Sequence, residues 1–169
     1  MATLKNELQR RLEGAKKIAV LGVGSELRGD DAAGIFVARL IAKKSSKIII
    51  SRKLKVFIGF TAPENLTGAI RRFKPTHLII VDCAKMNKPT GTIRLIDPHD
   101  AASSAFGTHN MPMKVLADYI TQTIGCVVII IGIQPQGVIF GKQFSRPVAK
   151  AVRTLAALVQ KVILAAKTN

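Results

Sequence analysis

The sequence predicts an α/β fold, a three-layer α/β/α sandwich around a mostly parallel sheet with one antiparallel edge strand. Three continuous apolar runs, each as long as a buried strand, alternate with amphipathic stretches of helical period. Strands that are apolar on both faces are typical of parallel sheets, which helices cover on both sides. The length of 169 residues suits one domain, so we expect residues 1–169 to form a single α/β unit.

The first half of the chain begins with an amphipathic helix and then alternates strands with helices. Leucines spaced at i, i+4 and i+8 predict a helix over 4–14 that ends at Gly14. The predicted elements that follow are a buried strand at 17–23, a glycine-bearing turn, a helix at 31–43, two short strands or one kinked edge strand at 47–51 and 55–59, and a helix from 61 to 73 with Pro63 in its first turn. Pro75 ends this last helix.

The second half continues the alternation and adds the edge strand. Its predicted elements are a second buried strand at 77–82, a turn at 89–91, a strand at 92–96, a helix from Asn110 to Thr123, a third buried strand at 127–133, and a last helix opened by Ser145 and Pro147. The strand at 92–96 alternates polar and apolar residues, which indicates a half-exposed, antiparallel position at the edge of the sheet.

The composition argues against several functional classes. A formal charge of +16 would suit a nucleic-acid partner, but the basic residues are scattered, Tyr119 is the only tyrosine, and tryptophan is absent. We therefore expect no nucleic-acid partner and attribute the charge to an acidic protein partner or a basic host proteome.

The longest apolar run, 126–133, is far shorter than the roughly 20 residues of a membrane helix. No signal peptide precedes the first helix, so we expect a cytoplasmic protein. No exposed apolar stripe is evident, which favours a monomer.

The two cysteines, Cys83 and Cys126, do not form a disulfide framework. The predicted strands place Cys83 at the end of one strand and Cys126 at the start of another, on opposite ends of the sheet. This separation is beyond the roughly 7 Å between Cα atoms that a disulfide tolerates. We expect two free thiols. No cation lies nearer to Cys83 in sequence than Lys85, which argues against a nucleophilic thiol.

Polar side chains are predicted to converge where the parallel strands end. Right-handed crossovers bring the carboxyl ends of all parallel strands to one end of the sheet. That end would collect the turn at 22–31, Asp82 and Gln134. The chain after the antiparallel strand must cross back to the same end, which could deliver residues 108–110. The expected constellation is Asp31, Asp82 and His109.

Two carboxylates and an imidazole suit either a divalent borderline metal such as Ni, Zn or Mn, or a pair of acid and base groups. Each residue also has a plain structural alternative. Asp30 or Asp31 would cap a helix, Asp82 would form a turn, and His109 would be a loop histidine bonded to backbone. His77, at the other end of its strand, is expected to be structural.

Rival motifs fit the sequence less well. The glycines at 22, 24 and 29 do not match G-x-G-x-x-G, and no Gly-Lys-Ser/Thr follows them, so neither a dinucleotide fingerprint nor a phosphate loop is satisfied. The carboxylates at 30 and 31 also oppose an anion site. Ser25 and Ser145 lack the G-x-S-x-G context of a nucleophilic serine.

A series of short motifs, from about Ile18 to Val159, resembles the hydrogenase maturation endopeptidases, and among them the type that serves hydrogenase 3. The motifs are Val23-Gly24-x4-Gly29-Asp30-Asp31-x2-Gly34, Ala62-Pro63-Glu64-Asn65, Thr76-His77 running to Asp82, Ile96-Asp97-Pro98, Thr108-His109-Asn110-Met111-Pro112, and Gly132-Ile133-Gln134-Pro135. Their order and spacing agree with the family. One departure is Ser25, which stands where the family usually has Asn. Residues 1–16 lie outside the resemblance and read as an added N-terminal surface helix before a core at 17–160.

The resemblance implies an aspartic or metal-assisted endopeptidase that removes the C-terminal extension of a [NiFe]-hydrogenase large-subunit precursor in a nickel-dependent step. The family's ligands carry over onto Asp31, Asp82 and His109, with Ni²⁺ presented by the precursor and Asp30 left as a helix cap or a support for the site. The alternative is a non-catalytic α/β module that binds a metal or an acidic partner without cleaving it.

Overall fold

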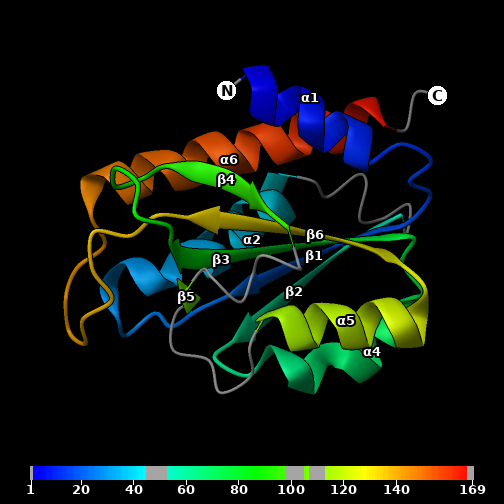
Figure 1. Cartoon of the computed structure of the whole chain (residues 1–169), viewed down its shortest axis with the longest axis horizontal. Helices are drawn as coiled ribbons and strands as arrows, with labels where there is room; N and C mark the ends of the chain where they lie inside the picture. Colours follow the sequence, from blue (N-terminus) through cyan, green and yellow to red (C-terminus); the bar gives the residue numbers. More distant parts are fainter. Residues whose placement is uncertain (1, 45–52, 98–104, 107–112, 167–169) are drawn as a thin grey trace.

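The computed structural model describes residues 2–44, 53–97, 105–106 and 113–166 (Figure 1). In chain order, the elements are the helices and strands α1 (Ala2–Arg11), β1 (Ile18–Val23), the 3-10 helix η1 (Gly29–Ala32), α2 (Ala33–Lys44), β2 (Leu54–Phe60), the 3-10 helix η2 (Pro63–Leu66), α4 (Thr67–Phe73), β3 (His77–Lys85), β4 (Ile93–Ile96), β5 (Ala105–Phe106), α5 (Met113–Ile124), β6 (Val127–Ile133) and α6 (Arg146–Ala165).

The sheet is mixed and mostly parallel, as predicted. Its strand order is β2-β1-β3-β6-β4. Three neighbouring pairs are parallel, with Ile18 opposite Leu54 and His77, and His77 opposite Val127. β4 pairs with β6 in the antiparallel sense and forms one edge of this order, which confirms the edge strand predicted from its alternating pattern. The parallel pairs bring the carboxyl ends of β1, β2, β3 and β6 together; we call this the carboxyl end of the sheet.

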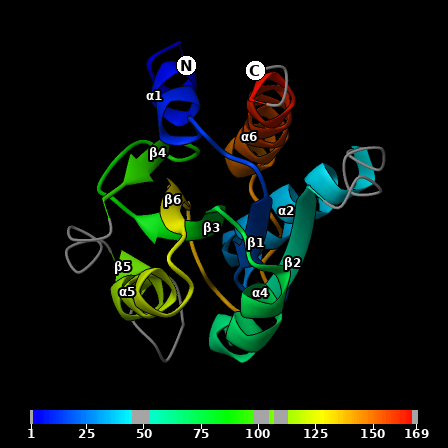
Figure 2. The ribbon, with the colours of Figure 1, turned by 90° about the vertical axis from the view of Figure 1, so that its right-hand side faces the viewer.

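Alternate residues of each central strand enter two separate cores. In β1, Ile18 and Val20 pack with α1, α2 and α6, whereas Ala19 and Leu21 pack with α4 and α5. Figure 2 shows α1 and α6 together on one side of the strands, and α4 and α5 on the other. Because side chains of a strand point alternately to opposite faces, a continuous apolar run is what two covered faces require. The three-layer arrangement is thereby confirmed.

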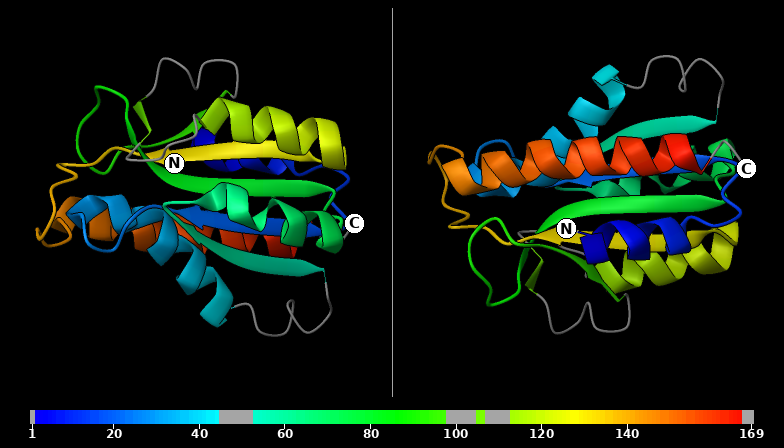
Figure 3. Two further views of the ribbon diagram at one scale, coloured as in Figure 1. Left: turned by 90° about the horizontal axis from the view of Figure 1, so that it is seen from below. Right: turned by 90° about the horizontal axis from the view of Figure 1, so that it is seen from above.

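The N-terminal helix packs one apolar face against the core and leaves its other described side chains exposed or half-buried. Leu8 of α1 and Leu12, which directly follows this helix, are fully buried in the core that contains α6, and the two helices lie along each other in Figure 3. The leucine spacing predicted this apolar face, although not the helix it contacts. The division into an added helix and a core at 17–160 stays a prediction.

Several boundaries differ from the predicted ones. The second buried strand continues to Lys85 rather than ending at Asp82, and short 3-10 helices precede α2 and α4. The predicted strand at 47–51 and the helix start at Asn110 lie outside the described residues. Both cysteines are buried free thiols, as predicted. Among the described helices, none combines the length and apolar character needed to span a bilayer.

After β4 the chain returns to the carboxyl end of the sheet, as predicted. β5 pairs antiparallel with Ala84 and Lys85, beyond the last residues of β3 that pair with β1 and β6. Residues 105–106 therefore lie next to the end of β3, two residues beyond Asp82.

Candidate active site

The turn between β1 and α2 depends on glycines that permit close backbone contact. Gly24 has φ +136°, and a Cβ there would lie 1.8 Å from the carbonyl oxygen of Asp31. A Cβ on Gly34 would lie 2.1 Å from the carbonyl oxygen of Val81 in β3 and 2.4 Å from that of Val23 in β1. The missing side chains let η1 and the first turn of α2 rest directly on the ends of β1 and β3. This close packing brings η1, with Asp31, against the strand that carries Asp82.

Asp31 and Asp82 are both fully buried at the carboxyl end of the sheet. Asp82 lies opposite Gly132 of β6, and its Oδ1 accepts a hydrogen bond of 2.6 Å from the backbone N–H of Cys83. Buried carboxylates are uncommon unless a partner or a cation compensates them. The chain has ten acidic residues, and Asp30, Asp31 and Asp82 are buried in this one region.

The pKa of the Cys83 thiol is raised by burial and by the nearby acids. Burial raises the pKa of Cys83 far above its usual range, and the negative charges of Asp82, Asp31 and Asp30, in decreasing order, raise that pKa further. Cys83 therefore stays protonated at neutral pH, which agrees with the prediction that it is not a nucleophile. The proximity of the two acids rests on the packing of their elements: η1, which carries Asp31, contacts β3, which carries Asp82, and both side chains are fully buried there.

Asp30 does not cap its own helix. Its Oδ2 accepts the backbone N–H of Gln136 at 2.8 Å, and its Oδ1 accepts that of Ser145 at 2.7 Å. Ser145 is the N-cap residue of α6, so the carboxylate lies at the positive end of that helix. Of the two roles expected for Asp30, the helix cap is wrong, because both oxygens bind residues more than 100 positions away. Asp30 supports the loop beside the site.

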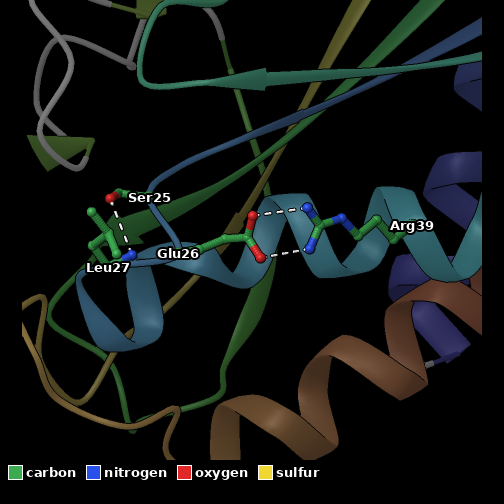
Figure 4. A network of polar contacts seen from close by, with 4 residues as sticks. All are labelled: Ser25, Glu26, Leu27 and Arg39. Atoms are coloured by element: carbon green, nitrogen blue, oxygen red, sulfur yellow. Dashed lines mark hydrogen bonds and ion pairs between the residues drawn. The ribbon is translucent and has the colours of Figure 1, made fainter.

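Ser25, which departs from the family pattern, still supports the turn. Its Oγ accepts the backbone N–H of Leu27 at 3.4 Å, a local serine turn (Figure 4). The next residue, Glu26, forms a two-pronged ion pair with Arg39 of α2, with distances of 2.6 and 2.8 Å. The turn therefore keeps hydrogen bonds to itself and to α2 without the asparagine.

His109 lies outside the described residues. Among the residues that the structure describes, no group of three His, Cys, Asp or Glu side chains is placed to hold a metal ion. The described residues nearest to His109 in sequence are Phe106 in β5 and Met113. Met113 is the first residue of α5 and is buried in the core that also contains α4. The role of the trio stays a prediction. His77 is buried at the opposite end of β3, away from these acids, as expected.

The comparison with known proteins identifies the family. The family described as "HycI: Hydrogenase maturation protease" matches residues 38–162. The hydrogenase 3 maturation protease of Escherichia coli is 40% identical over 139 residues, which span 80% of this chain and 84% of that protein. The chain belongs to the hydrogenase maturation proteases. It is accordingly an endopeptidase, a hydrolase of hydrogenase maturation.

Solved structures of this family agree with the fold. The crystal structure of the [NiFe] hydrogenase maturation protease HycI from Thermococcus kodakarensis superposes with a TM-score of 0.81 at 26% identity, covering 92% of this chain and 97% of that chain. The solution structure of the endopeptidase HycI from Escherichia coli gives a TM-score of 0.75 at 38% identity, covering 86% and 90%. The resemblance inferred from the motifs is thereby confirmed.

Sequence reasoning missed the contacts that hold the long segment after β6 in this protease. The N–H groups of Gln136 and Ser145 bind Asp30, and the Arg28 guanidinium donates to the carbonyl oxygen of Val138 at 3.4 Å. No local signal could have revealed these bonds, because the partners are separated by more than 100 residues in sequence. Gln134, in contrast, was expected at this end, and its Oε1 accepts the N–H of Met86 at 2.7 Å.

Proposed function

We propose that this protease removes the C-terminal peptide of a [NiFe]-hydrogenase large-subunit precursor, and that cleavage depends on nickel. One observation carries the proposal. Asp31 and Asp82 are fully buried at the carboxyl end of the sheet, on the contacting elements η1 and β3, in a member of the hydrogenase maturation proteases. Ligands of open α/β sheets bind at this end of the strands.

We further propose that the ligand set is Asp31, Asp82 and His109, acting on nickel that the precursor carries on its cysteine thiolates. Two carboxylates and one imidazole suit a borderline divalent ion. Two neighbouring carboxylates repel each other, and a divalent cation between them would turn that repulsion into attraction. Nickel belongs to the substrate in this proposal, although another divalent ion could occupy the same donors.

The covalent chain supports the inclusion of His109. Phe106 pairs with Ala84, two residues beyond Asp82, and His109 follows Phe106 by three residues. Only two residues separate His109 from Phe106 in sequence, so the imidazole belongs to the chain that directly follows β5.

The residues of this chain would bind and orient the substrate. Asp31 and Asp82 would hold the metal-bearing end of the precursor so that the scissile peptide lies at a fixed place. The nickel ion would polarise the scissile carbonyl or an attacking water. The close packing of η1 and the start of α2 on the strand ends, which Gly24 and Gly34 permit, would keep the two carboxylates at a constant distance from each other.

The test is cleavage of a co-expressed large-subunit precursor, followed by mass spectrometry with and without nickel. Asp31→Asn and Asp82→Asn should abolish the loss of mass while leaving the fold intact. Asp118→Asn is the matched control, because Asp118 is an acid on α5 that pairs with Lys114 at the protein surface. Cleavage at the unaltered rate by Asp31→Asn, or full cleavage without nickel, would contradict the proposal.

The alternative of a non-catalytic binding module predicts a stable complex with nickel-loaded precursor and no change in its mass. We also propose that the protease acts in the cytoplasm as a monomer without a nucleic-acid partner. Weak binding of oligonucleotides, with an affinity that changes little with salt concentration, would support the absence of a nucleic-acid partner.

A further inference from the structure

The segment after β6 is a loop that Asp30 holds at both ends. We call residues 136–145 the 136–145 loop. The two oxygens of the buried Asp30 carboxylate accept the N–H groups of Gln136 and Ser145, the first and last residues of this loop. Bonds between a carboxylate and backbone N–H groups are short and strong, and here they connect one side chain to both ends. The loop therefore has a defined position.

The middle of the loop is bound to the turn that precedes η1. The N–H of Gly141 donates to the carbonyl oxygen of Leu27 at 2.9 Å, and Arg28 donates to that of Val138 at 3.4 Å. Within the loop, the ring of Phe144 packs against that of Phe36 of α2, with the centroids 5.3 Å apart. Loop and turn thus form one continuous surface, which Figure 1 shows projecting beyond the carboxyl end of the sheet.

Three large apolar side chains are exposed on this surface. Leu27, Ile139 and Phe140 are 64%, 59% and 72% exposed, and we call them the apolar rim. Single exposed apolar residues are ordinary, but a group on loops that are held in place marks an interaction site. The backbone bond between Gly141 and Leu27 brings the members from the turn and from the loop together.

A cavity of about 550 Å³ lies beside the rim. Its lining includes Ile139 and Phe144, the cations Lys142 and Arg146, and Asp30. The two cations outnumber the single carboxylate in the lining, and the oxygens of that carboxylate already accept two backbone N–H groups, so the cavity is net positive toward a ligand. Residues 134–147 contain no acidic residue. The cavity thus fits a peptide segment with apolar and acidic side chains.

We propose that the apolar rim and this cavity bind the hydrogenase precursor, and that Asp30 is the positioning residue that holds the 136–145 loop for this purpose. The inference rests on the proposed function. Its occupant follows from continuity with the site, because Asp30 lines the cavity and its neighbour Asp31 belongs to the proposed ligand set. A second copy of the chain is disfavoured, because the surface is basic and the chain carries a net charge of +16.

The rim is tested with an Ile139→Ser, Phe140→Ser double variant in precursor cleavage. KM should rise at least about tenfold while kcat changes little, because the lost contacts bind the substrate outside the reacting bond. Leu164→Ser is the matched control: Leu164 is 55% exposed on α6, near the other end of that helix, and its loss should leave KM unchanged. An unchanged KM in the double variant, or an equal rise in the control, would overturn the proposal.

The role of Asp30 is tested by combining changes. Asp30→Asn keeps one acceptor and loses the other, so the loop loses one of its two ties and KM should rise. If Asp30 acts through the loop, Asp30→Asn should raise the KM of the double variant by a clearly smaller factor than it raises the KM of the natural protein. If Asp30→Asn raises KM by the same factor in both proteins, Asp30 acts elsewhere.

Binding without cleavage separates this inference from the proposed function. In the Asp31→Asn background, the affinity for nickel-loaded precursor is measured by titration calorimetry, with and without the rim changes. A loss of affinity of about tenfold on changing the rim supports the docking surface. If Asp31→Asn still cleaves, the same comparison is made with precursor prepared without nickel, so that binding is again measured without cleavage. Equal affinities would reject the docking surface. A change from dimer to monomer on altering the rim would also reject it, because the rim would then be a contact between copies.

Discussion

Asp30 and Asp31 are adjacent in sequence but have different surroundings. The Asp30 carboxylate binds two backbone N–H groups of the 136–145 loop, whereas Asp31 is fully buried in η1, which packs against β3, the strand of Asp82. Glycines at 24 and 34 create this difference, because they let the turn approach β1 and β3 closely. At the scale of single residues, the contacts of Asp30 thus assign it to the support of this loop, whereas a role of Asp31 in the chemistry belongs to the proposed function.

His77 leads to a prediction about pH. Burial at the start of β3 lowers the pKa of His77 below its ordinary value of 6.5. The unfolded chain therefore binds a proton there more readily than the folded one, so the contribution of neutral His77 is complete above pH 6.5 and is lost as the pH falls below it. The loss is at most about 1.4 kcal/mol per pH unit. Denaturant titrations at several pH values should show a smaller pH dependence in His77→Gln than in the natural protein. An identical dependence in both would contradict the prediction.

At the scale of elements, α2 and α4 each have a glycine as their second residue, but the two glycines have different surroundings. Gly34 in α2 faces backbone atoms of β1 and β3, at 2.1 Å and 2.4 Å from a hypothetical Cβ. Gly68 in α4 faces open space, with only the Arg72 guanidinium at 3.7 Å. The first glycine permits contact between helix and sheet, and the second has no such role.

These glycines give a matched pair of substitutions. Gly34→Ala should lower the free energy of unfolding by more than about 2 kcal/mol, because backbone must move to accept the methyl group. It should also reduce cleavage, since η1 with Asp31 moves with α2. Gly68→Ala should be neutral or stabilise the protein by up to about 1 kcal/mol, since alanine is the better helix former. Both values come from chemical denaturation. Equal effects would mean that close packing of α2 is not the reason for Gly34.

At the scale of the whole molecule, the charge is strongly unbalanced. The chain has 26 basic and ten acidic residues, and Asp30, Asp31 and Asp82 are buried at one end of the sheet. Other acids are paired at the surface, as in Glu7 with Arg11 and Glu26 with Arg39. The exposed surface is therefore more basic than the composition alone suggests, which suits an acidic partner.

This excess charge predicts that salt stabilises the fold. Mutual repulsion of surface cations opposes the compact state, and screening becomes effective once the Debye length falls to about 10 Å near 0.1 M salt. The melting temperature should therefore rise between about 0.01 M and 0.15 M sodium chloride. Sucrose at matched osmolality is the control for general solvent effects. A melting temperature that falls or stays constant with salt would show that repulsion is not significant.

The sequence by itself determined the layers, the edge strand and the carboxylates at the strand ends. Apolar runs, helical spacing and alternation are local patterns, and a right-handed parallel arrangement then places Asp31 and Asp82 at the same end. These features followed from the sequence because the spacing of apolar residues within each segment shows which of its faces are buried and whether it is a helix or a strand.

The tertiary structure decided what those patterns do not encode. It placed α1 against α6, returned the chain as β5 to the end of β3, and bound Asp30 to residues 106 and 115 positions away. It also left Leu27, Ile139 and Phe140 exposed, although their apolar character alone would predict burial. The physical reason is that hydrogen bonds and surfaces made by distant segments depend on how the layers pack, and no local period carries that information.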